Sequence, residues 1–336
     1  MNKVSIVIPV YNVEKYIEDC LMSVAEQSYP LIEIVLIDDC GTDNSMKIVE
    51  NTLKKISREG LEVTVVHHKK NEGLSVARNH GIDSAKGDYI LFLDSDDMLE
   101  PLCLKKMVSR IEETDADVVM CNHRTDVENR TLGGYLSAPV AELNSKEDCF
   151  HGLAKCWFNV MAWGKLLKTS FIRKHHLYFE EKIMNEDVLW TFQLCMEINK
   201  IAFVHEALFY YRYNSQSIMS SAKIIKKVNS AEIISRKYSE ILDTKVRLHG
   251  NKDVYIVLMR QIVLYYTIIA QNFGFKQYML KISLFSKYLY KKSFFPGYRE
   301  PLPITYKLWS LLFYMPVMLQ GIITYALIVI QNKKHS

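Results

Sequence analysis

The sequence lacks the cysteine pattern of a disulfide scaffold or of a structural zinc site. Its seven cysteines are odd in number, are irregularly spaced and include no C-x-x-C pair. A disulfide framework or a zinc ribbon requires paired spacings of that kind. We therefore expect reduced, mostly buried cysteines and a cytosolic compartment. The first residues lead directly into an apolar strand without a cleavage pattern, so no secretory leader is expected either.

Two glycine-rich phosphate-binding motifs are also missing. Neither G-x-G-x-x-G nor G-x-x-x-x-G-K-[ST] occurs, which argues against a dinucleotide-binding fold and against a P-loop. The chain has no internal repeat, no low-complexity segment and no Gly-rich linker. With 336 residues, of which 49% are hydrophobic, it is long enough for about two domains, at roughly one domain per ~150 residues.

A net charge of +4 hides an asymmetry along the chain. Residues 1–222 carry 24 Lys and Arg against 33 Asp and Glu, a net charge of −9. Residues 223–300 carry 15 against 5, a net charge of +10. The C-terminal third therefore presents a basic surface that suits anionic lipid. We expect a membrane surface, and no nucleic acid, among its partners.

One long run without charge lies near the C-terminus. Residues 308–330 contain no charged side chain and are flanked by lysines on both sides. The length of this run meets the requirement for a membrane-spanning helix. Pro316 and Gln320-Gly321 interrupt its middle, however, and a helix lying in the headgroup region fits the basic flank equally well. Both forms of membrane contact stay open, and a hydrophobic seam in a homo-oligomer is the remaining interpretation.

The first part of the chain alternates short apolar strands with amphipathic helices. This alternation predicts an α/β fold with a mostly parallel, Rossmann-like sheet and helices on both faces. Ligands of such sheets bind at the carboxyl edge of the strands. We expect strands at Val4–Val10, Ile34–Ile37, Val63–His67 and Tyr89–Leu93, and helices after a cap at Asn12, over about Ser45–Ile56 and over Ser75–Ala85.

Polar and acidic clusters end three of these strands. The clusters are Pro9-Val10-Tyr11-Asn12, Asp38-Asp39 and Asp94-Ser95-Asp96-Asp97. Carboxylates this close repel one another and cost stability unless a cation balances them. Because neighbouring parallel strands end at one edge, we expect the three loops to line one crevice.

Each acidic cluster has two interpretations. Asp94 and Asp96 either hold Mg²⁺ or Mn²⁺ beside a phosphorylated ligand or form a solvated turn that caps the next helix. Asp38-Asp39 either accepts hydrogen bonds from a ribose or a base or forms a turn, with Asp43 or Ser45 as helix cap.

Basic residues near these clusters are also open to more than one interpretation. Arg78, early in a helix, either reaches a diphosphate, holds the acidic loops in place or is an ordinary surface arginine. The pairs His67-His68 and His175-His176 show no ligand spacing and are interpreted as polar surface.

In these residues the sequence resembles the family 2 nucleotide-sugar glycosyltransferases of the GT-A fold. The resemblance covers residues 3 to about 125 and lies in VSIVIPVYNVEKYIEDCLMSVAEQSYPLIEIVLIDDCGTDNS and NEGLSVARNHGIDSAKGDYILFLDSDD. Weaker matches are AWGKLLKTSFI, NEDVLW and YYRYNSQSI further along the chain. The resemblance implies a nucleotide-sugar-binding half over 1–125 and an acceptor-binding half over 126–222. A basic helical region over 223–300 and a hydrophobic, membrane-associated tail over 301–336 complete the expected organisation.

A role for each matched residue follows from the resemblance. Asp96, with Asp94, matches the metal-binding carboxylates, and Asp187 matches the general base, with Glu186 as the second choice. The departure is Cys40-Gly41, where the family pattern is Gly-Ser, so the shape of this turn stays open. The residues that resemble contacts to the base, ribose and diphosphate are Pro9, Tyr11, Asn12, Glu14, Asp39, Asp43, Arg78, Asp94 and Ser95.

The resemblance implies sugar transfer from a nucleotide-diphosphate sugar, with UDP expected as the nucleotide, to a hydroxyl of a glycan or lipid-linked glycan. With Mn²⁺ or Mg²⁺ balancing the leaving group and one carboxylate as base, a single displacement inverts the anomeric centre. Surface-polysaccharide synthesis at the cytoplasmic face of the cell membrane is the expected setting. A nucleotidyltransferase and a non-catalytic membrane-bound scaffold are the alternatives.

Overall fold

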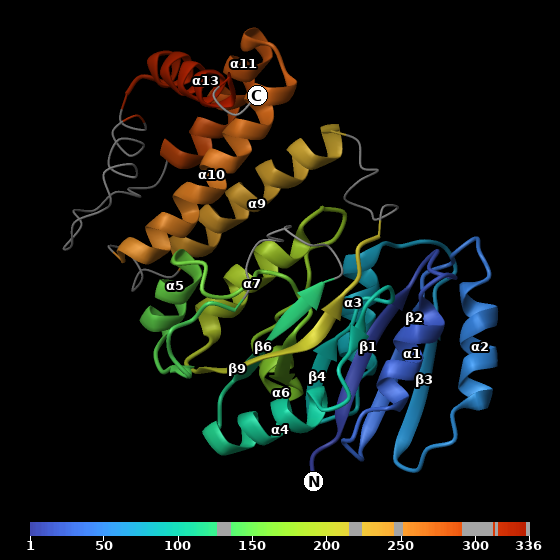
Figure 1. The fold of residues 1–336 in the computed structure, drawn as a ribbon. Helices are drawn as coiled ribbons and strands as arrows, with labels where there is room; N and C mark the ends of the chain where they lie inside the picture. Colours follow the sequence, from blue (N-terminus) through green and yellow to red (C-terminus); the bar gives the residue numbers. More distant parts are fainter. Residues whose placement is uncertain (126–135, 215–223, 245–250, 291–311, 313–314, 334–336) are drawn as a thin grey trace. The chain divides into compact units, whose positions relative to one another are not determined.

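The computed structural model describes residues 1–125, 136–214, 224–244, 251–290, 312 and 315–333, and the chain divides into two compact units (Figure 1). The first unit comprises Met1–Lys182 and Glu186–Ser217, and the second comprises Ile183–Asn185 and Ile218–Ser336. The finer division at residues 125 and 300 stays a prediction.

Four parallel strands form the N-terminal half of the sheet in the first unit. They lie in the order β3-β2-β1-β4, with bounds Leu61–His67, Ile32–Asp38, Val4–Val10 and Tyr89–Phe92. Val10 pairs with Asp38, and Asp38 pairs with His67, so these three strands end level with one another. The loops that follow them therefore begin at one edge of the sheet, as the sequence predicts.

Beyond β4 the sheet is mixed. Strand β8 (Lys165–Lys168) runs antiparallel to β4 and to β6 (Val118–Thr125), while β6 is parallel to β9 (Ile201–Tyr211). The two-residue strand β5 (Met98–Leu99) pairs with the end of β9, and β7 (Glu142–Leu143) pairs with its start. Strand β5 therefore ties the segment directly after the acidic cluster to a strand about a hundred residues further along the chain.

Helices cover both faces of this sheet (Figure 1). Because successive strand residues point to opposite faces, Ile6 and Ile8 of β1 join the core cluster that includes side chains of α1, α2 and α4, whereas Val7 faces α3. Phe92 of β4 contacts the ring of Trp190 on α7. The helices described in the first unit are α1 (Ile17–Ala25), α2 (Ser45–Lys55), α3 (Leu74–Ser84), α4 (Cys103–Thr114), α5 (Lys146–Ala154), α6 (Thr169–Lys174) and α7 (Glu186–Glu197).

Helices make up most of the described residues of the second unit. Its helices are α9 (Ile224–Thr244), α10 (Lys252–Asn272), α11 (Phe275–Tyr290) and α13 (Val317–Lys333). Helix α10 is long and apolar enough to cross a membrane, but 72% of its apolar window is buried inside the unit, as in the core helix of a soluble domain. All seven cysteines of the chain are free and five of them are buried, which agrees with the sequence-based expectation.

Helix α13 explains the polar residues that interrupt the C-terminal apolar run. It begins at Val317, directly after Pro316, and Gln320 and Thr324 are fully buried within the unit. The Thr324 hydroxyl is 2.7 Å from the Tyr278 hydroxyl of α11. These polar side chains therefore face the neighbouring helices, while several apolar residues of α13 lie on the outside, namely Met318, Leu319, Ile322, Leu327 and Ile330.

We predict that Gly81→Ala destabilises the first unit. A Cβ atom at this position of α3 would lie 2.2 Å from Cγ1 of Val7, which is fully buried in β1. Overpacking of this kind costs about 1–3 kcal/mol. Urea denaturation followed by tryptophan fluorescence measures the loss. Gly274→Ala is the control, because no heavy atom lies within 4 Å of a Cβ atom there. Equal stability of both variants would contradict the close packing of α3 on β1.

Candidate active site

Hydrogen bonds join the loop after β1 to the loop after β2. The side chain of Asn12, at φ 53°, accepts a hydrogen bond from Thr42 N through Oδ1 at 2.7 Å. Glu14 N donates to Asp43 Oδ2 at 2.9 Å, and Glu14 Oε2 accepts from Asn44 N at 3.0 Å. The prediction that Asn12 caps α1 is therefore wrong, because its side chain is turned toward the second loop. The two loops nevertheless bring three predicted residues together, as the predicted nucleotide site requires: Asn12, Glu14 and Asp43.

Asp43 lies one residue before the N-cap of α2 and bonds to the first residue of that helix. Its Oδ1 accepts hydrogen bonds from Ser45 N at 3.0 Å and from Ser45 Oγ at 2.6 Å. Partial burial opposes ionisation, but these hydrogen bonds and the one from Glu14 N lower the pKa of Asp43. The N-cap of α2 is Asn44, whose side chain makes no capping hydrogen bond. The prediction that Asp43 or Ser45 caps this helix is therefore wrong, although Asp43 accepts from the first backbone N–H of α2. Of the other predicted wall residues, Pro9 is buried in β1 and the side chain of Tyr11 is exposed.

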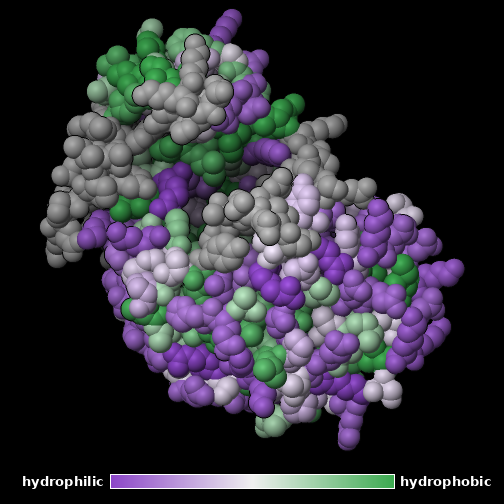
Figure 2. Space-filling view, in the orientation of Figure 1, coloured by the Kyte–Doolittle hydropathy of each residue, from purple (hydrophilic) through white to green (hydrophobic). Residues whose placement is uncertain are grey.

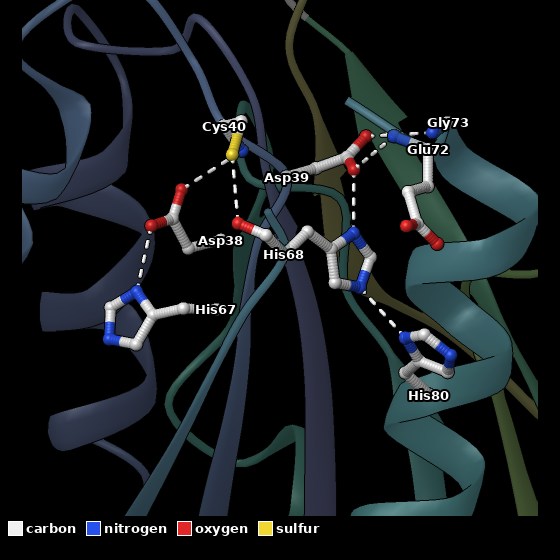
Figure 3. A network of polar contacts seen from close by, with 8 residues as sticks. All are labelled: Asp38, Asp39, Cys40, His67, His68, Glu72, Gly73 and His80. Atoms are coloured by element: carbon white, nitrogen blue, oxygen red, sulfur yellow. Dashed lines mark hydrogen bonds and ion pairs between the residues drawn. The ribbon is translucent and has the colours of Figure 1, made fainter. Parts of the chain in front are cut away.

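Asp39 is buried, with 3% of its surface exposed, and its carboxylate is already bonded within the protein. Oδ1 lies 2.7 Å from His68 Nδ1 and accepts a hydrogen bond from Glu72 N at 2.7 Å (Figure 3). Oδ2 accepts from Gly73 N at 2.9 Å. Asp39 therefore fixes the segment that leads into α3. Its contact with a base or ribose stays a prediction.

The Cys40-Gly41 turn keeps the backbone shape that glycine favours. Cys40 adopts φ 54°, and its thiol donates a hydrogen bond to His68 O at 2.8 Å. Beside it, Oδ2 of Asp38 lies 2.8 Å from Nδ1 of His67. The departure from the family pattern therefore adds an anchor between the ends of β2 and β3.

The interpretation of His67-His68 as polar surface is wrong for His68. Adjacent strand residues point to opposite faces, so the side chain of His67 stays 66% exposed while that of His68 is 2% exposed. His68 Nε2 lies 2.8 Å from Nδ1 of His80, on α3. The sequence alone does not predict that these two histidines are in contact, because they come from different elements.

Arg78 of α3 joins the end of β4 to the start of α7. Its Nη2 donates to Asp94 Oδ1 at 2.7 Å, and its Nη1 donates to Glu186 Oε1 at 2.6 Å. The residue is 2% exposed, and the Phe179 ring lies 5.3 Å from Cζ. Burial opposes its charge, but Asp94 and Glu186 outweigh burial and raise the pKa of Arg78. Arg78 therefore holds the acidic loops in place, and its contact with a diphosphate stays a prediction.

Asp187 lies in the first turn of α7, beside Glu186. Burial first, and then the charge of Glu186, raise the pKa of Asp187 to about 7, while Arg78 and Lys165 act in the opposite direction. Burial lowers the pKa of Lys165 to about 8. A carboxyl group whose pKa is near neutral is suited to accept a proton from an attacking hydroxyl.

Asp96 and Asp97 carry more negative charge than their protein partners balance. Asp96 Oδ2 accepts a hydrogen bond from Asn214 Nδ2 at 3.0 Å, and burial together with Asp94 raises the pKa of Asp96. Asp97 Oδ1 accepts from Arg212 N at 2.8 Å, and its buried Oδ2 has no partner among the described residues. Ser95, between the predicted ligands, is buried. This oxygen donor set fits Mg²⁺ or Mn²⁺ at Asp94 and Asp96.

Sequence reasoning missed Asn214. It follows β9, and the pairing of Met98 in β5 with Tyr210 in β9 brings the residues after β9 to the acidic cluster. Arg212, in the same segment, also reaches Asp19 Oδ2 at 3.1 Å. The available signal was the YYRYNSQSI match, which marks this segment without showing what it contacts.

Comparisons with known proteins agree with this geometry. The model of the family described as Glycosyl transferase family 2 matches residues 5–190. The Bacillus subtilis protein EpsH, named as a glycosyltransferase, is 30% identical over 74% of this chain and 75% of its own length. TarS of Staphylococcus aureus, named a poly(ribitol-phosphate) beta-N-acetylglucosaminyltransferase, is 28% identical over 75% of this chain, which spans 43% of TarS.

Two solved structures share the fold. Residues 1–349 of TarS in complex with UDP-GlcNAc superpose with a TM-score of 0.73 at 20% identity, covering 99% of this chain and 92% of that one. The mannosyltransferase PcManGT of Pyrobaculum calidifontis, in complex with GDP-Man and Mn²⁺, superposes with a TM-score of 0.54 at 16% identity, covering 97% and 86%.

We predict that Arg78→Met lowers the free energy of unfolding by about 3–5 kcal/mol, because it leaves two carboxylates at a buried site without their cation. Urea denaturation measures this loss. Arg124→Met is the matched control: its side chain is 55% exposed and pairs with Glu100, so we expect a loss of about 1 kcal/mol or less. A similarly small loss for Arg78→Met would show that the bridge is not structural.

Proposed function

The chain belongs to glycosyl transferase family 2, and from this premise we propose an inverting, divalent-metal-dependent transfer. The donor is a UDP-linked sugar, and the acceptor is a hydroxyl of a glycan or lipid-linked glycan. The observation that carries the proposal is the network in which Arg78 joins Asp94 to Glu186, next to Asp187. This network brings the predicted metal-binding and proton-accepting groups into one site.

Asp187 acts as the general base in this proposal. Its carboxylate takes the proton of the acceptor hydroxyl as the oxygen attacks the sugar. Arg78 and Lys165 keep a fraction of Asp187 ionised near neutral pH by opposing the effect of burial. Glu186 is engaged with Arg78, so it positions that cation and leaves proton transfer to its neighbour.

Asp94 and Asp96 act on the leaving-group side. When bound, Mg²⁺ or Mn²⁺ balances the negative charge that develops on the departing nucleotide diphosphate. Asp96 is mostly surrounded by protein and receives one hydrogen bond from Asn214, which fixes the orientation of its carboxylate. With one base and one departing group, a single displacement inverts the anomeric centre.

Relatives support the choice of donor and acceptor. TarS binds UDP-GlcNAc in its solved structure and is named for transfer to a poly(ribitol-phosphate). PcManGT binds GDP-Man with Mn²⁺. These proteins favour a nucleotide-diphosphate sugar with a divalent cation as the donor system, and the name of TarS favours a polymer with hydroxyl groups as the acceptor. No observation favours a nucleotidyltransferase or a non-catalytic scaffold.

A thermal-shift panel of nucleotide sugars, each with and without Mn²⁺, identifies the donor. We predict that a UDP-sugar raises the melting temperature and that Mn²⁺ enlarges the rise. Asp187→Asn should retain this Mn²⁺-dependent shift while transfer falls by at least about 100-fold, the contribution of a positioned acid or base. Asp96→Asn should lose the Mn²⁺-dependent part of the shift.

Two controls make this assignment of roles decisive. Glu181→Gln changes an exposed carboxyl in the segment before α7 and should leave binding and transfer unchanged. The transfer rate of the wild type should fall as the pH drops below about 7, because a protonated Asp187 cannot accept a proton. Transfer by Asp187→Asn at half the wild-type rate would show that another group is the base.

Localisation at the cytoplasmic face of the membrane is a second part of the proposal. Large apolar side chains are exposed along α11 and α13, and Figure 2 shows hydrophobic side chains gathered over the part of the unit where Figure 1 places these helices. Helix α13 has 17 residues, fewer than the ~20 that a spanning helix needs. Lys276 lies exposed on α11 and suits anionic headgroups. We therefore propose that this face lies on the lipid surface.

Co-sedimentation of the full chain with anionic lipid vesicles tests this localisation. The variant Leu280→Gln, Leu284→Gln, Met318→Gln, Ile322→Gln changes four exposed side chains and should weaken binding at least about 10-fold. The control Val63→Gln, Val65→Gln changes exposed apolar residues of β3 and should sediment as the wild type does. Undiminished sedimentation of the fourfold variant would refute the membrane-facing surface.

A further inference from the structure

We propose that His68, Glu72 and His80 form a second divalent-cation site, of the kind that zinc prefers. One ligand atom from each of the three residues lies within 4.8 Å of the other two. His68 directly follows β3, Glu72 lies in the loop before α3, and His80 is on α3 (Figure 3). This site is separate from the carboxylates at Asp94 and Asp96, and it does not depend on the proposed transfer reaction.

The hydrogen bond to Asp39 prepares His68 as a metal ligand. The Asp39 carboxylate already accepts from Glu72 N and Gly73 N, and its Oδ1 lies 2.7 Å from His68 Nδ1. An ionised carboxylate only accepts, so the proton is on Nδ1 and the lone pair is on Nε2. A carboxylate that holds the far nitrogen of a histidine is the usual support of a metal-binding imidazole.

His68 Nε2 faces a second imidazole. It lies 2.8 Å from His80 Nδ1, and the two rings meet edge to face, with centroids 4.8 Å apart and an interplanar angle of 89°. Without a cation, His80 Nδ1 donates its proton to this lone pair. With a cation, His80 takes its other tautomer and shifts, so that both nitrogens present lone pairs to the ion.

Small movements suffice to admit the ion. Two nitrogens bound to tetrahedral zinc at ~2.0–2.1 Å are about 3.3 Å apart, so His80 has to move by roughly half an ångström. Its side chain is half-buried on α3, and Glu72 is exposed. The buried His68 is thus the fixed ligand, and His80 and Glu72 would move toward the metal. A water molecule would complete four-coordination.

The ligand types separate this site from the acidic cluster. Two imidazoles and one carboxylate suit zinc and its neighbours among the transition metals, whereas Asp94 and Asp96 offer only oxygen and suit Mg²⁺ or Mn²⁺. The same loop supplies both a ligand, Glu72, and two backbone donors to Asp39. An ion held here would therefore stiffen the segment that fixes Asp39.

Titration of the EDTA-treated full chain with Co²⁺, in excess Mg²⁺ that fills the oxygen site, tests the proposal. We expect one equivalent with the visible absorption of a four-coordinate ion, no thiolate band, and displacement by Zn²⁺. His80→Ala and Glu72→Gln should each weaken binding by at least about 10-fold, the lower limit for loss of an outer-shell partner. Both positions are partly or fully exposed, so each variant should fold.

His67→Ala is the matched control. This histidine neighbours His68 and also faces a carboxylate, Asp38, but it points to the other side of β3. Its removal should leave Co²⁺ binding unchanged. Equal binding by wild type and His80→Ala, or absence of a four-coordinate spectrum in the wild type, would show that the two histidines form a hydrogen-bonded pair only and would overturn the proposal. Since the measurement involves no sugar transfer, failure of the transferase mechanism would leave it unaffected.

Discussion

The buried ion pair network around Arg78 is the constraint on which the site depends. One buried guanidinium pairs with carboxylates from two distant parts of the chain, and a buried charge of this kind is costly without its partners. Fixing Asp94 and Glu186 also fixes their neighbours, Asp96 and Asp187. The same cation thus constrains where the proposed metal ligands lie and lowers the pKa of the proposed base, Asp187. The acidic residues can lie close together because a buried arginine pairs with two of them.

The sequence predicted the N-terminal half of the fold closely, because that half is built from local signals. Alternating apolar strands and amphipathic helices predicted β1 to β4, α2 and α3 to within about two residues, whereas α1 begins at Ile17, further along the chain than the expected cap at Asn12 implies. The acidic strand ends marked the edge of the sheet where the site lies. The mixed strands beyond β4 carry weaker patterns. Strand β5 has only two residues and β8 has four, so long-range pairing decides their existence rather than local periodicity.

The site itself was predictable in its membership but not in its contacts. Asp39 was expected to face a ligand, yet backbone amides and His68 surround it. Asn12 was expected to cap a helix, yet it bonds to Thr42 in the next loop. His68 was assigned to the surface because its partner, His80, lies twelve residues away on another element. In each case the partner comes from a different loop, and single-residue patterns contain no such information.

Two of the hydrogen bonds at the acidic site join residues very far apart in the chain. Arg78 and Glu186 are 108 residues apart, and Asp97 and Arg212 N are 115 apart. Loop closure of this length is costly before its contacts form and slows folding. On a ribosome, the first hundred residues can build their parallel strands and pair Asp94 with Arg78. The contacts of Asp97 with Arg212 N and of Arg78 with Glu186 form only after those later residues have been made. The contact of Asp97 thus forms only once β9, the last strand of the sheet along the chain, has been made.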